Sequence, residues 1–479
     1  MNFLLQDAPA AAGIVSCIHD AIGIGTGKPA PPVHQDATGG QYTVPPLSKD
    51  WESPPMTRIA LRTGVALILL VTQVRATASD VPSLDVARQV LDSGNASDAV
   101  VLYEALTRQG ESLEAEIGLV RAALQAGEFR KAMSWATLVA GEHADSAEAV
   151  ALLAYLQDRI GRTEQALAAL EQLRAKEPTA AVAVAAQADI LIDRLASENA
   201  SQVLNAWVAR NPHIASADLQ MIHSRALAAG PAPNRHSFQH AQASGSHFRV
   251  WPRPTFEAFP AAGALAGSGN GLVVEEGNYV LTSPGVVPPG KSHIYVRNGL
   301  GKIRRAERVE GGENQGLVRL RLLSPFPADY SFPDEQITAP EGARFCFAFG
   351  FSVPSSPYPT YPAVVPGIVV RPDAGVGRLM QVTSALGAGH AGSPIFDPRG
   401  RLLGLATSPG EILIGGENLR ARVGSGHFAV RAIAVRRDTP GGPAASPQLS
   451  GPQPPMPAVE ELYERLIPSI VQIVVLDSP

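Results

Sequence analysis

The sequence predicts a multidomain chain of mixed α and β class, in which a block of helical hairpins precedes a β-rich domain. An Ala- and Leu-rich stretch over residues 79–230 repeats itself every 33 to 34 residues, a period typical of stacked helical pairs. From residue 246, short β-branched runs alternate with Gly and Pro turns, which is typical of a sandwich or a barrel. The length of 479 residues is enough for roughly three domains.

Composition and cysteine content exclude several classes of protein. A hydrophobic share of 45% excludes wholesale disorder, and the single short apolar run excludes a polytopic membrane protein. Two cysteines are too few for a disulfide scaffold or a Cys-rich zinc module. The net charge of −5 argues against an obligate nucleic-acid binder. We expect no cofactor and no metal site.

Charge is divided unevenly between the two blocks. Residues 80–230 carry 12 basic and 20 acidic side chains, a net of −8, whereas residues 231–440 carry 21 and 15, a net of +6. Opposite signs on adjacent blocks are consistent with two units that dock on each other. They are equally consistent with a chance split between two solvated surfaces.

The first 78 residues read as a leader followed by a signal peptide. Residues 1–55 are rich in Gly and Pro and lack periodicity, so we expect them to be unstructured or untranslated. Residues 56–78 combine two arginines, a short apolar run and the small-x-small cleavage pattern at Ala76–Ala78. This apolar run is too short to span a bilayer of about 30 Å. A start at Met56 therefore predicts a periplasmic or secreted protein, and an earlier start leaves its location undetermined.

The repeat in residues 79–230 is carried by residues at fixed offsets. In each unit an alanine follows a reference position by five residues: Gly94 and Ala99, Gly127 and Ala132, Gly161 and Ala166, Leu195 and Ala200. The pattern resembles the tetratricopeptide repeat, most closely over Gly161–Pro178. This resemblance implies an α-solenoid of three to four helical pairs with a concave, partner-binding surface. A structural spacer is the alternative.

A linker over residues 231–245 leads into the β-rich domain, residues 246–437, where a series of motifs stands in a recognisable order. They are Gly267–Gly269 with Leu272–Val274, Tyr279–Thr282, Leu317–Leu320, Gly389–Pro394 with Arg401–Thr407, and Gly426–Val430. In this order they resemble the bacterial trypsin-like serine proteases of the HtrA/Deg type. The resemblance implies a trypsin-like double β-barrel, so we expect an α-solenoid of helical hairpins followed by a trypsin-like (pseudo)protease domain.

Each position at which this family carries a catalytic residue holds a different residue here. Gly285 stands in place of the acid–base histidine, Asn314 in place of the orienting aspartate and Ala391 in place of the nucleophilic serine. The reaction needs a nucleophile, a general base and a group that orients the base. Because glycine cannot accept a proton and alanine has no oxygen, the resemblance predicts no catalytic residue at these positions.

Neighbouring polar residues offer no evident replacement. Ser393 lies two residues past the nucleophile position, where we expect a tolerated small residue. His390, His293 and His427 are expected to be surface or loop histidines, because none occupies the position of the base. Cys346 is flanked by phenylalanines and is expected in the core of a strand. No zinc-protease or Cys-His motif supplies another mechanism.

The main chain of the nucleophile loop can bind an anion without these side chains. Because an oxyanion hole uses main-chain N–H donors, we expect Gly389, His390 and Ala391 to form an oxyanion-hole-like loop. A trypsin-like cleft can also bind an extended peptide by adding it as a strand. Binding without cleavage is therefore chemically consistent.

The end of the chain contains a linker and one more pair of elements. Residues 438–458 form a Pro/Gly-rich linker, and residues 459–479 predict a helix followed by a strand. This pair resembles the opening of trypsin-like domains of the same family. Because the linker is long and the earlier motifs account for both barrels, we expect it to start a second, truncated trypsin-like domain. The alternative is that its strand completes the first barrel.

These observations predict an exported, non-catalytic trypsin-like protein that binds peptides or proteins and regulates or scaffolds a protease. A protein or peptide is the expected partner, with no nucleic acid and no stable membrane span beyond the signal peptide. Two alternatives are an active serine endopeptidase with a relocated triad and a fragment of a longer tandem protease.

Overall fold

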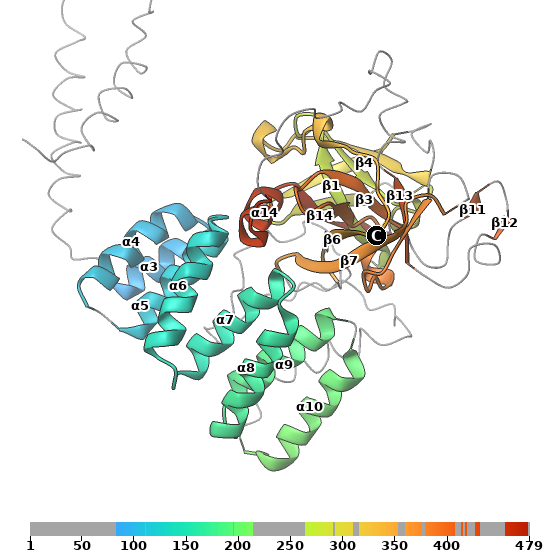
Figure 1. Cartoon of the computed structure of the whole chain (residues 1–479). Coiled ribbons are helices and arrows are strands. Elements are labelled where there is room, and N and C mark those ends of the chain that lie inside the picture. The colour runs from blue at the N-terminus through green and yellow to red at the C-terminus, as the bar shows by residue number, and fades with distance from the viewer. Residues whose placement is uncertain are drawn as a thin grey trace, which may run out of the picture. The chain divides into compact units, whose positions relative to one another are not determined.

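The computed structural model describes most of the helical block, both barrels and the C-terminal elements, namely residues 83–110, 112–194, 196–213, 264–290, 293–309, 316–352, 360–374, 379–407, 413–414, 417–418, 427–431 and 456–477. Figure 1 shows helical pairs in the first part of the chain and β-strands in the second, with helix α14 close to the end. The predicted leader, signal peptide and first linker, and most of the second linker, lie outside the described residues.

Eight helices precede the barrels in the segments that the structure describes. They are α3 Leu84–Asp92, α4 Ala96–Arg108, α5 Leu113–Gln125, α6 Phe129–Glu142, α7 Ala147–Arg159, α8 Thr163–Lys176, α9 Ala181–Asp193 and α10 Ser197–Arg210. The starts of α5, α7 and α9 lie 34 residues apart, as do those of α6, α8 and α10. The predicted helical repeat is therefore a stack of helical pairs.

Glycine and alanine have separate roles in this stack. Gly94, Gly127 and Gly161 follow the first helix of their pairs with φ angles of +87°, +85° and +83°. Glycine adopts this conformation at the least cost, and it turns the chain from the first helix into the second. The alanines five residues later are fully buried in the second helices: Ala99, Ala132, Ala166 and Ala200. A longer side chain there would force the close-packed helices apart.

The first barrel is closed and antiparallel, with the strand order β1-β14-β3-β4-β5-β2. Its strands are β1 Leu265–Val274, β2 Tyr279–Thr282, β3 His293–Asn298, β4 Ile303–Arg308, β5 Val318–Leu322 and β14 Ile470–Leu476. Strand β14 pairs with β1 on one side and with β3 on the other, and Ile473 lies opposite both Gly269 and Val296. Every residue of β14 is buried.

The position of β14 corrects the interpretation of residues 459–479 as the start of a second domain. Their strand lies inside the first barrel, between β1 and β3, and closes it. The physical reason is that β1 and β3 do not pair with each other, so both would present unpaired main-chain groups without β14. The alternative, in which this strand completes the first barrel, is the one that the structure shows.

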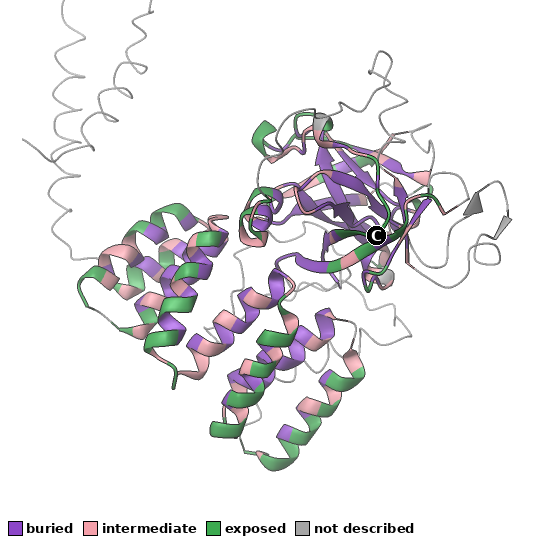
Figure 2. Cartoon of the chain, in the orientation of Figure 1, coloured by how far each residue is buried: buried purple, intermediate pink, exposed green. Residues whose placement is uncertain are grey.

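The second barrel has the strand order β10-β13-β8-β7-β6-β9. Its strands are β6 Arg344–Gly350, β7 Ala363–Arg371, β8 Leu379–Val382, β9 Pro394–Phe396, β10 Leu402–Ala406 and β13 His427–Arg431. A separate pair is formed by β11 Leu413–Ile414 and β12 Glu417–Asn418. Figure 2 shows buried residues along the strands of both barrels and a buried and an exposed side on most helices. The predicted double β-barrel is confirmed.

Helix α14, Val459–Leu466, packs against helix α6 of the repeat and against the second barrel. The Tyr463 ring lies 4.2 Å from the Phe129 ring, between centroids, and its hydroxyl donates to the carbonyl of Pro362 (2.7 Å). Arg130 and Arg162 of the repeat pair with Glu464 and Glu460 of α14. In this contact the repeat contributes the cations and α14 the carboxylates, although residues 80–230 carry a net charge of −8.

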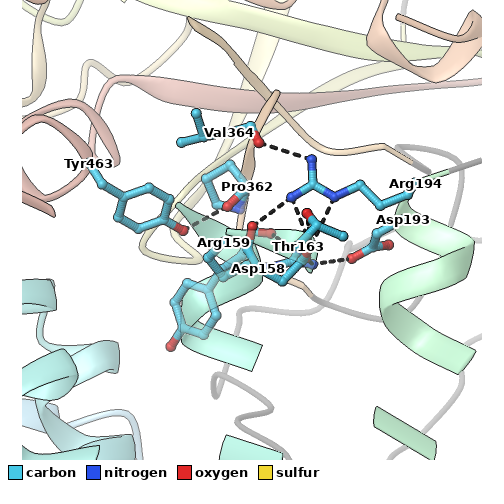
Figure 3. Close-up of polar contacts among 9 residues, drawn as sticks. Asp158, Arg159, Thr163, Asp193, Arg194, Pro362, Val364 and Tyr463 are labelled. Atoms are coloured by element: carbon cyan, nitrogen blue, oxygen red, sulfur yellow. Dashed lines mark hydrogen bonds and ion pairs between the residues drawn. The ribbon is translucent and has the colours of Figure 1, made fainter. Parts of the chain in front are cut away.

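A buried cluster of charged side chains joins the repeat to the second barrel (Figure 3). Arg159 donates to the carboxylates of Asp158 and Asp193, at 2.6 Å each, and to the carbonyl of Tyr361 (3.0 Å). Arg194 donates to Asp158 (2.9 Å) and to the carbonyl of Val364 (2.9 Å). The two arginines therefore neutralise the carboxylates and also satisfy main-chain acceptors of the barrel.

Replacing Ile473 tests the placement of β14. We expect Ile473→Ala to lower the free energy of unfolding by about 2 to 5 kcal/mol, because this side chain is fully buried in the first barrel. The measurement is urea unfolding, followed by the tryptophan signal and by far-UV circular dichroism. Met456→Ala, at an exposed residue just before α14, is the control and should change this free energy by less than about 0.5 kcal/mol. Equal effects would contradict the closed barrel.

Replacing Arg159 tests the buried cluster. Arg159→Met removes the cation that pairs with the buried Asp193, so we expect a loss of about 3 to 5 kcal/mol in the free energy of unfolding. Arg162→Met is the matched control, because the Arg162–Glu460 pair is partly exposed and should contribute less than about 1 kcal/mol. If both variants unfold at the same urea concentration, the cluster does not hold the repeat on the barrel.

Candidate functional site

Two of the loops assigned to the triad meet at strand β1. Gly285 lies in the 3-10 turn η1, Pro284–Val286, directly after β2, and is half-buried. A side chain at Gly269 of β1 would contact Val286 and would lie 2.8 Å from the carbonyl oxygen of Ala391. The structure thus brings the positions of the missing base and the missing nucleophile together, on either side of Gly269.

The third triad position, that of the orienting aspartate, lies outside the described residues. Asn314 falls in the segment 310–315, of which nothing is described. The strand that follows, β5, pairs with the end of β2 through Val318 and Thr282. The chain therefore leaves this segment beside the loop that carries Gly285, in agreement with the order of the motifs.

Ala391 lies in the core rather than at a surface. Its side chain is buried in the same apolar cluster as Val286, Val287 and Ile473 of the first barrel. The carbonyl of Ala391 accepts the main-chain N–H of Asn270 (2.7 Å), which fixes the loop against β1. A methyl group at this position packs well and supplies no nucleophile.

The loop expected to resemble an oxyanion hole is wound into a 3-10 turn, η5, Ala388–His390. The N–H of His390 donates to the carbonyl of Gly387 (3.0 Å). Two further main-chain bonds hold the residues after the turn, from the N–H of Gly392 to the carbonyl of Ala406 (2.8 Å) and from the N–H of Ser393 to the carbonyl of His390 (2.9 Å). That Gly389, His390 and Ala391 act as an oxyanion-hole-like loop stays a prediction.

Asn270 holds this loop in place, although it was not among the predicted site residues. Its side-chain Nδ2 donates to the carbonyls of Gly389 (2.7 Å) and Phe351 (3.2 Å), and its Oδ1 accepts the N–H of Phe351 (2.7 Å). Its own carbonyl accepts the hydroxyl of Thr282 (2.6 Å). One buried amide thus connects β1, β2, β6 and η5. Its position after Gly269 was the available signal, because a lone Asn within a strand motif needs partners if it is buried.

Ser393 lies in the core, two residues past Ala391. It is fully buried, and its hydroxyl oxygen lies where a side chain at Gly350 would be. This hydroxyl has no hydrogen-bond partner among the described residues, so no base is positioned to activate it. The expectation of a tolerated small residue agrees with this environment.

His390 lies in a loop, which is one of the two expected placements, but it is buried rather than at the surface. Its Nδ1 accepts the N–H of Gly387 (3.2 Å), which places the proton of the neutral ring on Nε2. Burial, with smaller contributions from Arg194 and His427, lowers the pKa of His390 to about 4, whereas Asp193 acts in the opposite direction. The ring is therefore neutral at pH 7.

The other residues singled out by sequence are accounted for by the fold. His293 and His427 begin β3 and β13 and are half-buried. Cys346 is fully buried in the second barrel, as expected, and burial raises the pKa of its thiol to about 11. A thiol protonated at neutral pH is a poor nucleophile.

One group of possible metal ligands occurs among the described residues, in the helical repeat. Ligand atoms of Glu116, Glu142 and His143 lie within 4.8 Å of one another. The His143 Nε2 and the Glu116 carboxylate are already joined by a hydrogen bond of 2.9 Å, and Glu142 is exposed. This hydrogen bond accounts for the proximity of the group without an ion.

The pH dependence of stability tests the environment of His390. Above pH 6.5 the ring is neutral in both the folded and the unfolded state. Between pH 6.5 and 4 the unfolded chain binds a proton that the folded protein does not, so the free energy of unfolding falls as the pH falls. In His390→Gln we expect the free energy of unfolding to fall by roughly 3 kcal/mol less between pH 7 and pH 4 than in the wild type, as measured by urea unfolding. His213→Gln, at an exposed histidine, should keep the wild-type decrease. If His390→Gln also keeps it, His390 is not the buried neutral group described here.

Comparisons with known proteins agree with this architecture. Residues 269–405 match the family model of the trypsin-like peptidase domain. The protease domain of MamO from Magnetospirillum magneticum, in its apo form, is similar at 20% identity, over 37% of this chain and 86% of that one, with a TM-score of 0.26. The serine endoprotease from Yersinia pestis is similar at 19% identity, over 37% of this chain and 56% of that one, with a TM-score of 0.27. No curated protein matches.

No helix in the described part of the chain is both long and apolar enough to cross a membrane. The family match runs from β1 through β10 and so includes strands of both barrels and the loop of Ala391. Over this range the chain is similar to the trypsin-like peptidase domain.

Proposed function

We propose that this chain is a non-catalytic trypsin-like protein that binds peptides or proteins. The observation that carries the proposal is the environment of Ala391, a methyl group in the core of the first barrel at the nucleophile position. Gly285, at the position of the base, has no side chain either. Removing members of a catalytic triad costs several powers of ten in rate.

The loop that carries Ala391 is held against β1 by Asn270. The Asn270 side chain donates to the carbonyl of Gly389, and its main-chain N–H donates to the carbonyl of Ala391. The frame around the nucleophile position is therefore kept, and the proposal rests on the missing side chains rather than on the main chain of the loop.

A relocated triad finds no support in the same region. Ser393 is fully buried without a hydrogen-bond partner among the described residues, and Ser352 is buried in the same way. His390, the nearest buried imidazole in sequence, accepts a hydrogen bond from its own loop. A nucleophile must reach both a base and a substrate, and neither serine does.

Both the barrels and the helical stack can bind a peptide or protein without a catalytic triad. A trypsin-like cleft binds an extended peptide as an added strand, and this requires main-chain groups rather than a triad. The helical stack, which we interpret as tetratricopeptide-like, provides a second surface. We further propose that the protein is exported when translation starts at Met56, and that it regulates a protease or presents substrates to one.

A protease probe tests the absence of catalysis. We expect the folded full chain to show no labelling by a fluorophosphonate above that of the heat-unfolded chain, because glycine and alanine occupy the positions of the base and the nucleophile. An active trypsin-like protease is the positive control. A fluorescent unfolded protein should bind, with a rise in anisotropy, and remain intact on a gel.

Labelling of the wild-type chain would overturn the proposal. Ser393→Ala would then identify or exclude Ser393 as the nucleophile. A variant with Gly285→His, Asn314→Asp and Ala391→Ser shows whether the frame still supports catalysis. Cleavage of the unfolded protein by the wild-type chain would also contradict the proposed absence of catalysis. Failure to bind the unfolded protein would contradict the proposed binding role.

A further inference from the structure

A groove of about 610 Å³ opens in the helical repeat, at the end where three successive pairs begin. The first residues of α5, α7 and α9 line it: Leu113, Ala147 and Ala181. Together with Ala180 and Val182 they form an apolar floor. The volume lies within the range of sites that take up several side chains of a ligand.

The remaining wall of the groove is acidic. Asp145 and Glu177 are exposed and Glu148 is half-buried, and no Lys or Arg lines the groove. None of these three carboxylates forms an ion pair among the described residues. Glu148 accepts a hydrogen bond from Ser146 (3.4 Å), and His143, which also lines the groove, is hydrogen-bonded to Glu116. Three carboxylates around one opening without a lysine or arginine produce a negative potential, which attracts a cationic ligand and repels an anionic one.

Helix α9 adds hydrogen-bond donors to the floor of the same groove. Its N-cap residue, Ala180, makes no side-chain cap, and its first turn contains no acidic residue. Neither the N-cap nor the first turn therefore supplies a side-chain acceptor for the N–H groups at the start of α9. Helix α7 differs, because the hydroxyl of its N-cap Ser146 accepts the N–H of Ala149 (3.2 Å).

We propose that this groove binds an extended segment of a partner protein that is rich in lysine and arginine. Main-chain carbonyls of the segment accept the free N–H groups at the start of α9, and its apolar stems lie on the floor of the groove. Its cationic ends pair with Asp145, Glu148 and Glu177. This inference rests on the proposed protein-binding function and names the chemistry of its partner.

Three labelled peptides of equal length test the proposal with the full chain. They alternate alanine with lysine, with glutamate or with glutamine, and binding is followed by fluorescence anisotropy. We expect the lysine peptide to bind most tightly, and its affinity to fall with added salt because the carboxylates are exposed. The glutamate peptide should show no binding.

Matched variants locate the binding in the groove. Asp145→Asn, Glu148→Gln and Glu177→Gln together should weaken binding of the lysine peptide by about tenfold. The control combines Asp92→Asn, Glu164→Gln and Glu198→Gln, which remove the same charge at exposed sites outside the groove and should leave the affinity unchanged. Ala180→Lys keeps all the carboxylates but places a cation in the groove, and should also weaken binding.

Equal affinity for the three peptides, or equal loss in both triple variants, would overturn the proposal. So would an unchanged affinity in Ala180→Lys. These outcomes are distinguishable from a failure of the proposed function. Cleavage by the wild-type chain contradicts the absence of catalysis but leaves the groove intact. Binding of an unfolded protein without any preference for the lysine peptide contradicts the groove alone.

Discussion

The buried pairing of Arg159 with Asp158 and Asp193 is the interaction on which the joint between the repeat and the barrels depends. Burial works against every charge in the cluster, but the carboxylates hold the pKa of Arg159 well above its ordinary value. Burial likewise opposes ionisation of Asp158, and Arg159 and Arg194 outweigh it, so that its pKa is lowered. Each group is charged only because its partners are in place, and the arginines also bond to the carbonyls of Tyr361 and Val364. A purely apolar interface would allow the repeat to shift along the barrel, whereas these directional ion pairs and hydrogen bonds form in one relative position only.

The end of the chain completes the same joint. Helix α14 lies on α6, its Tyr463 bonds to the carbonyl of Pro362 beside β7, and the strand that follows closes the first barrel. One short segment thus connects the repeat, the first barrel and the second barrel. Its residues are far in sequence from all their partners, since β14 pairs with β1 across about 200 residues. The complete arrangement can therefore form only after the last segment has been made.

Local signals explain what could be predicted from the sequence. The repeat was predictable because Gly127 must turn the chain with a positive φ and Ala132 must fit between helices, and both requirements act within one unit. The position of β14 could not be predicted, because its apolar pattern suits a strand of either barrel and its partners are distant in sequence. Asp158-Arg159 looks like any surface charge pair in a helix, because its partners Asp193, Arg194 and Tyr361 are distant in sequence. The partners of Asn270 are equally distant, so its position after Gly269 could not identify them.

The identification of the family and the assignment of activity depend on different residues. Gly392 has a φ of +78°, and a side chain there would collide with the Asn270 carbonyl, so the loop needs glycine to lie against β1. Gly269 is needed in the same way, because Val286 and Ala391 approach it closely. These glycines carry the motif and also hold the barrels together. The fold does not depend on the catalytic side chains at the triad positions, since glycine occupies position 285 and alanine packs well at 391. A chain can therefore lack the catalytic residues and still keep every residue that the fold requires. For this reason a match to the fold does not establish catalytic activity.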